Sequence, residues 1–84
     1  MSRHAMGIFA TRFDEAMRAD GRTNEQFARD AGFVLRTVMR WRRGESVPMG
    51  EALVRLAAAL GREPAWFYKP LDDPNGEPDR AAAA

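Results

Sequence analysis

Residues 23–44 of the chain form the stretch TNEQFARDAGFVLRTVMRWRRG, and this stretch decides the fold. Thr23 is followed three positions later by Gln26, which is the pattern of a capping box at the start of a helix. Gly32 and Gly44 each stand where a glycine commonly ends a helix. The stretch therefore predicts two short helices, each of them closed by one of these glycines.

The link between these two helices, at 32–34, determines how they cross. A link this short that begins with glycine holds two helices at a steep angle. Ala28 fits such a crossing, because a larger side chain would push the helices apart. The small and apolar residues keep the spacing of a helix-turn-helix, and they are Phe27, Ala28, Ala31, Gly32, Phe33, Val38 and Trp41. Helical hairpins that bind no DNA can show the same pattern, so this alternative stays open.

The sequence on either side predicts three further helices. One covers 7–20 and ends at Gly21. Its apolar stripe consists of Phe9, Phe13, Ala16 and Met17. The other two cover 49–60 and 64–68, and Pro64 suits the first turn of the latter. Because no stretch has the alternating pattern of a strand, we expect an all-α fold, a compact five-helix bundle.

The length of 84 residues is about half that of a usual domain, so we expect one compact unit. Apolar residues make up 45% and charged residues 30%, which is an ordinary balance for a globular protein. We expect a flexible N-terminal arm over 1–6, the folded domain over 7–70, and a flexible acidic and alanine-rich tail over 71–84.

Composition excludes several classes of function. The chain has no Cys, which excludes a disulfide, a thiolate metal site and a Cys nucleophile. Its single histidine, His4, has no partner residue for a metal site or a catalytic base. The longest strictly apolar run, at 56–60, is far below the ~18 residues of a membrane span. We therefore expect a cytoplasmic protein that is not an enzyme, with no metal, no cofactor, no catalytic residue and no membrane partner.

Charge is distributed unevenly along the chain. Its 13 basic residues nearly balance its 12 acidic ones, but residues 70–84 are net negative and residues 1–69 net positive. Four arginines fall within eight positions, and they are Arg36, Arg40, Arg42 and Arg43. Because arginine suits both phosphate and the guanine edge, this cluster is compatible with a nucleic-acid partner.

The helix that carries these arginines begins at Val34 or Leu35 and runs to Arg43. At about 100° per residue, one face is expected to pack on the core. That face consists of Val34, Val38 and Trp41. The opposite face consists of Arg36, Arg40 and Arg43, and it is adjoined by Leu35 and Met39. We expect the arginine face to be exposed.

Residues 9–68 resemble the five-helix DNA-binding domain of the Cro/CI repressor family, also called the XRE family. The resemblance rests on the stretch at 23–44, on the pattern P-x-x-E-x-L-x-R-L-A-x-A-L-G at 48–61, and on the aromatic W-F-Y at 66–68. It implies a fold of the lambda-repressor type, in which the second and third helices form the helix-turn-helix. It also implies sequence-specific binding to double-stranded DNA.

The resemblance further implies which residues meet the DNA. Base contacts in the major groove fall to Leu35, Arg36, Met39 and Arg40. Phosphate contacts fall to Asn24, Thr23, Arg43, Gly44, Arg22 and Arg42. Asn24 stands where the family usually has a longer Gln. A solvated basic face, or a protein partner docked on Leu35 and Met39, is the alternative for this surface.

A single module of this size makes few DNA contacts, which favours a homodimer on a palindromic operator with half-sites ~34 Å apart. The candidate interface residues are Phe67, Tyr68 and Leu71, and the alternative is that they cover the core as a lid. We expect a small transcriptional regulator, a repressor of prokaryotic or phage type. The alternative is a protein-interaction module, antitoxin-like or polymerase-contacting, with weak DNA readout. Acidic groups at Glu45 or Glu51 are candidates for contacting RNA polymerase.

Three positions depart from the family pattern. Val34 stands where a capping side chain is usual, so its helix lacks a contribution of ~1 kcal/mol. Met17 and Arg42 stand where the family often pairs an Arg with a Glu, so this ion pair is expected to be absent. Arg62 replaces the usual apolar residue after Gly61, which is expected to loosen the docking of the last helix.

Overall fold

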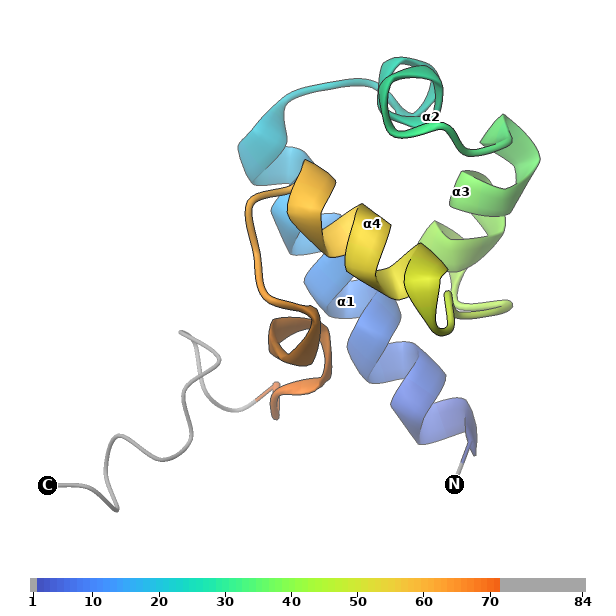
Figure 1. The fold of residues 1–84 in the computed structure, drawn as a ribbon. Helices are drawn as coiled ribbons and strands as arrows, with labels where there is room; N and C mark the ends of the chain where they lie inside the picture. Colours follow the sequence, from blue (N-terminus) through green and yellow to red (C-terminus); the bar gives the residue numbers. More distant parts are fainter. Residues whose placement is uncertain (1, 72–84) are drawn as a thin grey trace, which may run out of the picture.

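The computed structural model describes the backbone of residues 2–71 and the side chains of residues 7–71. This part of the chain is helical and contains no strand, so the all-α class is confirmed for it (Figure 1). Its elements are α1 (Ser2–Asp20), α2 (Asn24–Ala31), α3 (Leu35–Arg43), α4 (Glu51–Ala59) and the 3₁₀ helix η1 (Pro64–Tyr68). The tail expected at 71–84 lies outside the described residues except for Leu71.

The expected count of five α-helices is wrong in its last member, because η1 is a 3₁₀ helix of 5 residues. Its bonds join positions three apart: the Trp66 N–H donates to the Glu63 carbonyl at 3.0 Å and the Lys69 N–H to the Trp66 carbonyl at 3.3 Å. Pro64 cannot donate, and Pro70 follows directly after Lys69. A segment this short between two prolines cannot establish an α-helical ladder.

Two helix boundaries also differ from the prediction. Helix α1 begins at Ser2, ahead of the expected start at residue 7. Residues 2–6 contain neither Gly nor Pro, so no helix-breaking residue among them prevents the helix from starting at Ser2. Helix α4 begins at Glu51 instead of residue 49, because Gly50 has φ 55 and ψ −130, outside the helical region.

The capping box of α2 is confirmed. The Thr23 side-chain oxygen accepts from the Gln26 N–H at 3.0 Å, and the Thr23 N–H donates to the Gln26 Oε1 atom at 3.0 Å. Gly32 ends the helix in the left-handed region, with φ 80 and ψ 31. Because these signals lie within a few residues of each other, the helix ends could be predicted from the sequence.

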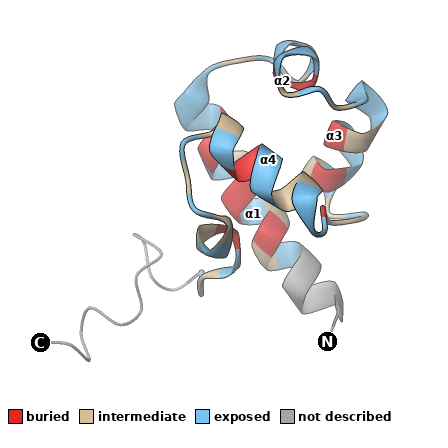
Figure 2. Ribbon diagram, viewed as in Figure 1, coloured by how far each residue is buried: buried red, intermediate tan, exposed pale blue. Residues whose placement is uncertain are grey.

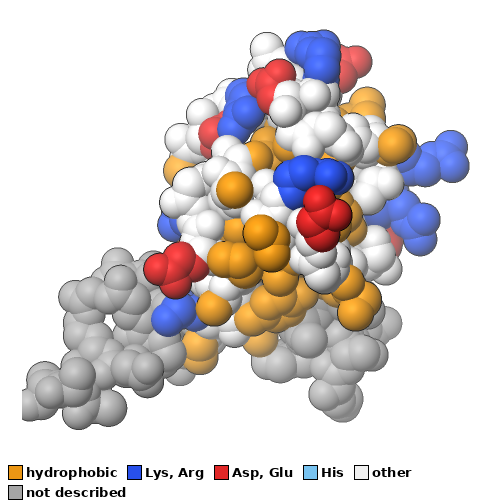
Figure 3. Space-filling model, viewed as in Figure 1, with side chains coloured by type: hydrophobic (Ala, Val, Ile, Leu, Met, Phe, Trp, Pro, Cys, Tyr) orange, Lys and Arg blue, Asp and Glu red, His pale blue; other side chains and the backbone are white. Residues whose placement is uncertain are grey.

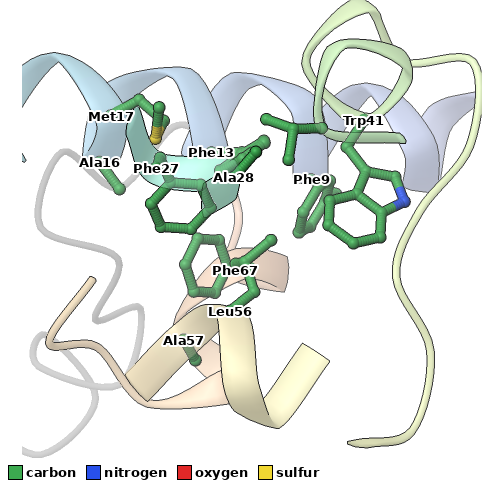
Figure 4. Packing of buried hydrophobic residues seen from close by; sticks show 11 residues of the cluster. Phe9, Phe13, Ala16, Met17, Phe27, Ala28, Trp41, Leu56, Ala57 and Phe67 are labelled. Carbon is green, nitrogen blue, oxygen red and sulfur yellow. The ribbon is translucent and has the colours of Figure 1, made fainter. Parts of the chain in front are cut away.

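A single aromatic core lies between α1 and the other elements (Figures 2 and 4). All four residues of the predicted stripe on α1 are buried. Phe13 of α1 lies 6.0 Å from Phe27 of α2 and 6.5 Å from Trp41 of α3, measured between ring centroids. Phe67 of η1 lies 5.6 Å from Phe9. Burying one such ring contributes about 1.5–3 kcal/mol, so these aromatic contacts help to hold α2, α3 and η1 against α1.

A buried arginine fastens η1 to α1. The Arg12 side chain is buried, its Nε atom donates to the Lys69 carbonyl at 3.4 Å, and its Nη2 atom donates to the Pro70 carbonyl. Its guanidinium also lies 5.4 Å from the Trp66 ring and pairs with Glu15 at 3.1 Å. The Arg62 guanidinium also lies over the Trp66 ring, 4.1 Å from its centroid. The residue after Gly61 therefore packs through a cation–π contact instead of an apolar one.

Candidate nucleic-acid interface

Helix α3 turns one face into the core and the opposite face to solvent. Val38 and Trp41 are buried, whereas the exposed face consists of Leu35, Arg36, Met39, Arg40 and Arg43. Basic side chains protrude at the edge of the molecule where α3 lies (Figure 3). The geometry therefore gathers all four predicted base-contacting residues on one accessible surface, which we call the α3 face and define by these five exposed residues.

The expectation that Val34 packs on the core is wrong, because 67% of this residue is exposed. Val34 is the N-cap of α3, with extended φ −77 and ψ 135. Helical periodicity does not apply to a residue outside the helix, so the 100° rule misplaced it. As expected, its side chain caps nothing.

One carboxylate partly neutralises the α3 face. The Glu45 Oε2 atom lies 2.8 Å from Arg43 Nε, and its Oε1 atom lies 3.7 Å from Arg40 Nε. The hydrogen bond from Arg43 holds the pKa of Glu45 below its ordinary value and raises the pKa of Arg43. Within residues 7–71, Arg36 makes no ion pair. Arg36 is therefore the most available cation of the α3 face.

Arg42 does not belong to this face. Its Nη1 atom donates to the Asn24 Oδ1 atom at 2.7 Å, and its Nη2 atom contacts the Asp14 Oδ1 atom of α1. The family's pair between positions 17 and 42 cannot form, because Met17 carries no charge, but Arg42 pairs instead with Asp14, so the acid lies on α1 and the base on α3. Asp14 also accepts from Arg18 Nε at 2.7 Å, and the bond from Arg42 is the main cause that lowers the Asp14 pKa. Arg42 is thus engaged inside the domain.

Arg22 is likewise committed to internal partners. Its guanidinium bonds Asp20 Oδ2 at 2.7 Å and the Ala59 carbonyl at 2.9 Å, lies 3.3 Å from Asp30 Oδ2, and packs 5.3 Å from the Phe27 ring. The bond to Asp20 is the main cause that raises the Arg22 pKa and lowers that of Asp20. These contacts join the α1–α2 link to the end of α4, so the geometry favours a structural role over the predicted phosphate contact.

The Gly44 N–H is also already bonded, because it donates to the Trp41 carbonyl at 3.2 Å and toward the Arg40 carbonyl. The predicted phosphate contact through this group is therefore not supported. Of the six predicted phosphate-contacting residues, three remain in a suitable position, and they are Thr23, Asn24 and Arg43.

The predicted interface residues separate into two groups. Phe67 is fully buried, which corrects its assignment to an interface: it packs on the core as the lid alternative required. Tyr68 and Leu71 are 38% and 44% exposed. Burial raises the pKa of Tyr68, whose ring lies 5.9 Å from that of Phe9.

Two residues with structural roles were not predicted from the sequence, Asp14 and Arg12. Asp14 lies three positions before Met17 on α1, which places it on a neighbouring part of the helix surface. Its pairing with Arg42 depends on how α1 and α3 cross, which periodicity within one helix does not give. Arg12 lies between the buried residues Phe9 and Phe13. No local signal indicates that its guanidinium donates to backbone carbonyls 57 and 58 positions away.

The family model described as helix-turn-helix matches residues 15–67, which include α2, α3 and α4. The chain belongs to this helix-turn-helix family. The match confirms the resemblance to the Cro/CI type and indicates a DNA-binding transcription regulator. Comparison with curated proteins and with solved structures gives no significant match.

In the described part of the chain, no helix combines the length and the apolar character that crossing a bilayer requires. Among the same residues, no three His, Cys, Asp or Glu side chains gather in a way that could hold a metal ion.

Proposed function

We propose that this protein binds double-stranded DNA in a sequence-specific manner, as a small dimeric transcriptional regulator that lays the α3 face in the major groove. The observation that carries the proposal is the orientation of α3. Three arginines of this helix face solvent while Val38 and Trp41 hold its reverse in the core. A helix presented in this way fits the width of the major groove.

The base contacts are assigned to four residues of the α3 face. Arg36 and Arg40 have the two-pronged donor geometry that matches guanine O6 and N7. Leu35 and Met39, 36% and 37% exposed, offer apolar surface to thymine methyl groups. Arg36 contributes most to specificity, because no ion pair within residues 7–71 has to be broken before it binds.

The phosphate contacts are assigned to Arg43, Asn24 and Thr23. Arg43 lies at the end of α3, exposed beside the arginines that meet the bases. Asn24 and Thr23 begin α2, where the positive end of a helix dipole favours an anion. These contacts fix the register of the domain on the duplex without adding sequence preference.

Dimerisation places two copies of α3 in successive major grooves of a palindromic operator, ~34 Å apart. Tyr68 and Leu71 supply the apolar part of this interface, since both are exposed at the end of the domain. Bound at a promoter in the cytoplasm, such a dimer would exclude RNA polymerase and repress transcription. Glu51, exposed at the start of α4, is the remaining acidic candidate for a direct polymerase contact.

A second candidate function is a protein-interaction module with weak DNA readout. It is favoured by the adjacent exposed side chains of Val34 and Leu35, which have no partner in DNA unless thymines lie beneath them. DNA selection separates the two functions, because a docking module would enrich no common sequence.

The deciding experiment is selection of bound fragments from random duplex DNA, followed by sequencing. We expect a palindromic consensus whose half-sites are one helical turn apart. Arg36→Ala and Arg40→Ala should each weaken operator binding by ~1–3 kcal/mol and relax the preference at one base pair. Arg29→Ala removes an exposed arginine of α2 outside the α3 face and serves as the matched control. No consensus, or unchanged preferences in both α3 variants, would contradict the proposal.

A further inference from the structure

Asp14, Arg42 and Asn24 form a chain of polar contacts that runs across three helices. Arg42 of α3 bonds Asn24 at the start of α2 through one terminal nitrogen and Asp14 of α1 through the other. We propose that Arg42, held by Asp14, is a positioning residue that fixes the Asn24 amide with its NH₂ group facing outward to a DNA phosphate. This inference rests on the proposed DNA-binding function and assigns a new role to two residues that do not touch DNA.

The orientation of the amide follows from the chemistry of the partner. A guanidinium carries hydrogen-bond donors and no acceptor, so only the oxygen of Asn24 can face Arg42. The 2.7 Å distance between Arg42 Nη1 and Asn24 Oδ1 is typical of a bond assisted by charge. Because the amide group is planar, its NH₂ group then points away from Arg42. An exposed asparagine without such a partner would rotate freely and present oxygen as often as nitrogen.

Asp14 determines where the guanidinium lies. The Arg42 side chain is only 24% exposed, so its charge is partly removed from water and needs a nearby anion. Asp14 supplies that anion and is itself also bonded by Arg18. Neutralised in this way, Arg42 contributes little charge to the DNA surface, and its effect on binding passes through Asn24. Fixing a donor before binding reduces the entropy that is lost in the complex.

The alternative role for Arg42 is a purely structural one, in which it ties α3 to α1 and leaves Asn24 unaffected. A double-mutant cycle on the full chain separates the two roles. The variants are Asn24→Ala, Arg42→Met and the two combined, and the dissociation constant is measured on the operator obtained by selection. Loss of Arg42 leaves Asp14 paired with Arg18 and about a third exposed, so no isolated buried charge results.

We expect Asn24→Ala to weaken binding about five- to tenfold in the wild-type background, as for the loss of one ordinary hydrogen bond. In the Arg42→Met background the same change should cost less than about twofold, because the amide is already free to rotate. Arg43→Met is the matched control. Arg43 lies on the same helix but bonds Glu45 and not Asn24, so its loss should combine additively with Asn24→Ala.

Thermal unfolding of each variant without DNA supplies the readout for a structural role. If Arg42→Met does not fold, Asp14→Asn replaces it, and the NMR signals of the Asn24 side-chain NH₂ group report whether the amide is still ordered. If the wild-type protein binds the operator but Asn24→Ala weakens that binding equally in the wild-type and Arg42→Met backgrounds, the positioning role alone is overturned. Wild-type protein that binds no operator would overturn the proposed function and this inference with it.

Discussion

At the scale of a single residue, Glu45 controls how much positive charge the α3 face offers. It is paired with both Arg43 and Arg40, and all three side chains are about half exposed. Ion pairs in such surroundings are worth roughly 0–1 kcal/mol, so a phosphate can displace the carboxylate, but part of its binding energy is lost in doing so. Glu45 thus acts as an internal competitor of the ligand.

We therefore predict that Glu45→Gln strengthens binding to both operator and random duplexes by about two- to fivefold. The relative gain should be larger on random DNA, where charge contributes most of the affinity. Titration of labelled duplexes at several salt concentrations measures both effects. Glu63→Gln, which removes an exposed carboxylate at the start of η1, is the control. Weaker binding by Glu45→Gln would mean that the carboxylate orients the arginines.

At the scale of an element, α3 has an unused site for stabilisation at its start. Its N-cap, Val34, already has the extended backbone of a capping residue but no side-chain acceptor. Val34 is also largely exposed, so its replacement sacrifices little burial. We predict that Val34→Ser raises the free energy of unfolding by about 0.5–1 kcal/mol. Chemical denaturation measures the change. Thr23→Val, which removes the cap of α2, should lower stability by a similar amount, and equal stability of both variants would refute the capping argument.

The docking of η1 depends on a contact that no local sequence signal indicates. Arg12→Ala would leave the carbonyls of Lys69 and Pro70 without their donor and open a cavity beside Trp66. We predict a loss of about 2–4 kcal/mol in the free energy of unfolding. Arg18→Ala, on the exposed side of α1, should cost less than about 0.5 kcal/mol. Similar midpoints for the two variants in thermal unfolding would show that the Arg12 contacts contribute nothing.

The elements also show where sequence reasoning succeeds. The ends of α2 and α3 were predictable because the Thr23 cap and the glycines that end both helices act over one turn. The exposed arginines followed from periodicity within a single helix. The pairing of Arg42 with Asp14 could not be predicted in this way, because Asp14 is 28 positions away and the pairing depends on how α1 and α3 cross. Local physics determines the elements and their faces. Contacts between elements require the packed structure, and such contacts engage two of the six predicted phosphate-contacting residues, Arg22 and Arg42.

At the scale of the whole molecule, ion pairs make the stability of the fold depend on pH. The pKa values of Asp14 and Asp20 are lowered in the folded protein, chiefly by hydrogen bonds from Arg42 and Arg22. A carboxyl group whose pKa is lower when folded binds fewer protons than the unfolded chain, so it stabilises the fold above its ordinary pKa of 3.8. That stabilisation is lost as the pH falls through the lowered value.

We therefore predict that the thermal midpoint is nearly constant from neutral pH down to about 5 and falls steeply below about pH 4. Asp14→Asn and Asp20→Asn should each lower the midpoint at pH 7 and make the acid fall shallower, because part of the titrating stabilisation is already gone. Glu63→Gln, whose carboxylate makes no ion pair within residues 7–71, should follow the wild-type curve. Midpoints recorded between pH 7 and pH 2 test this. If the thermal midpoints of the asparagine variants fall as steeply in acid as that of the wild type, these pairs do not link folding to pH.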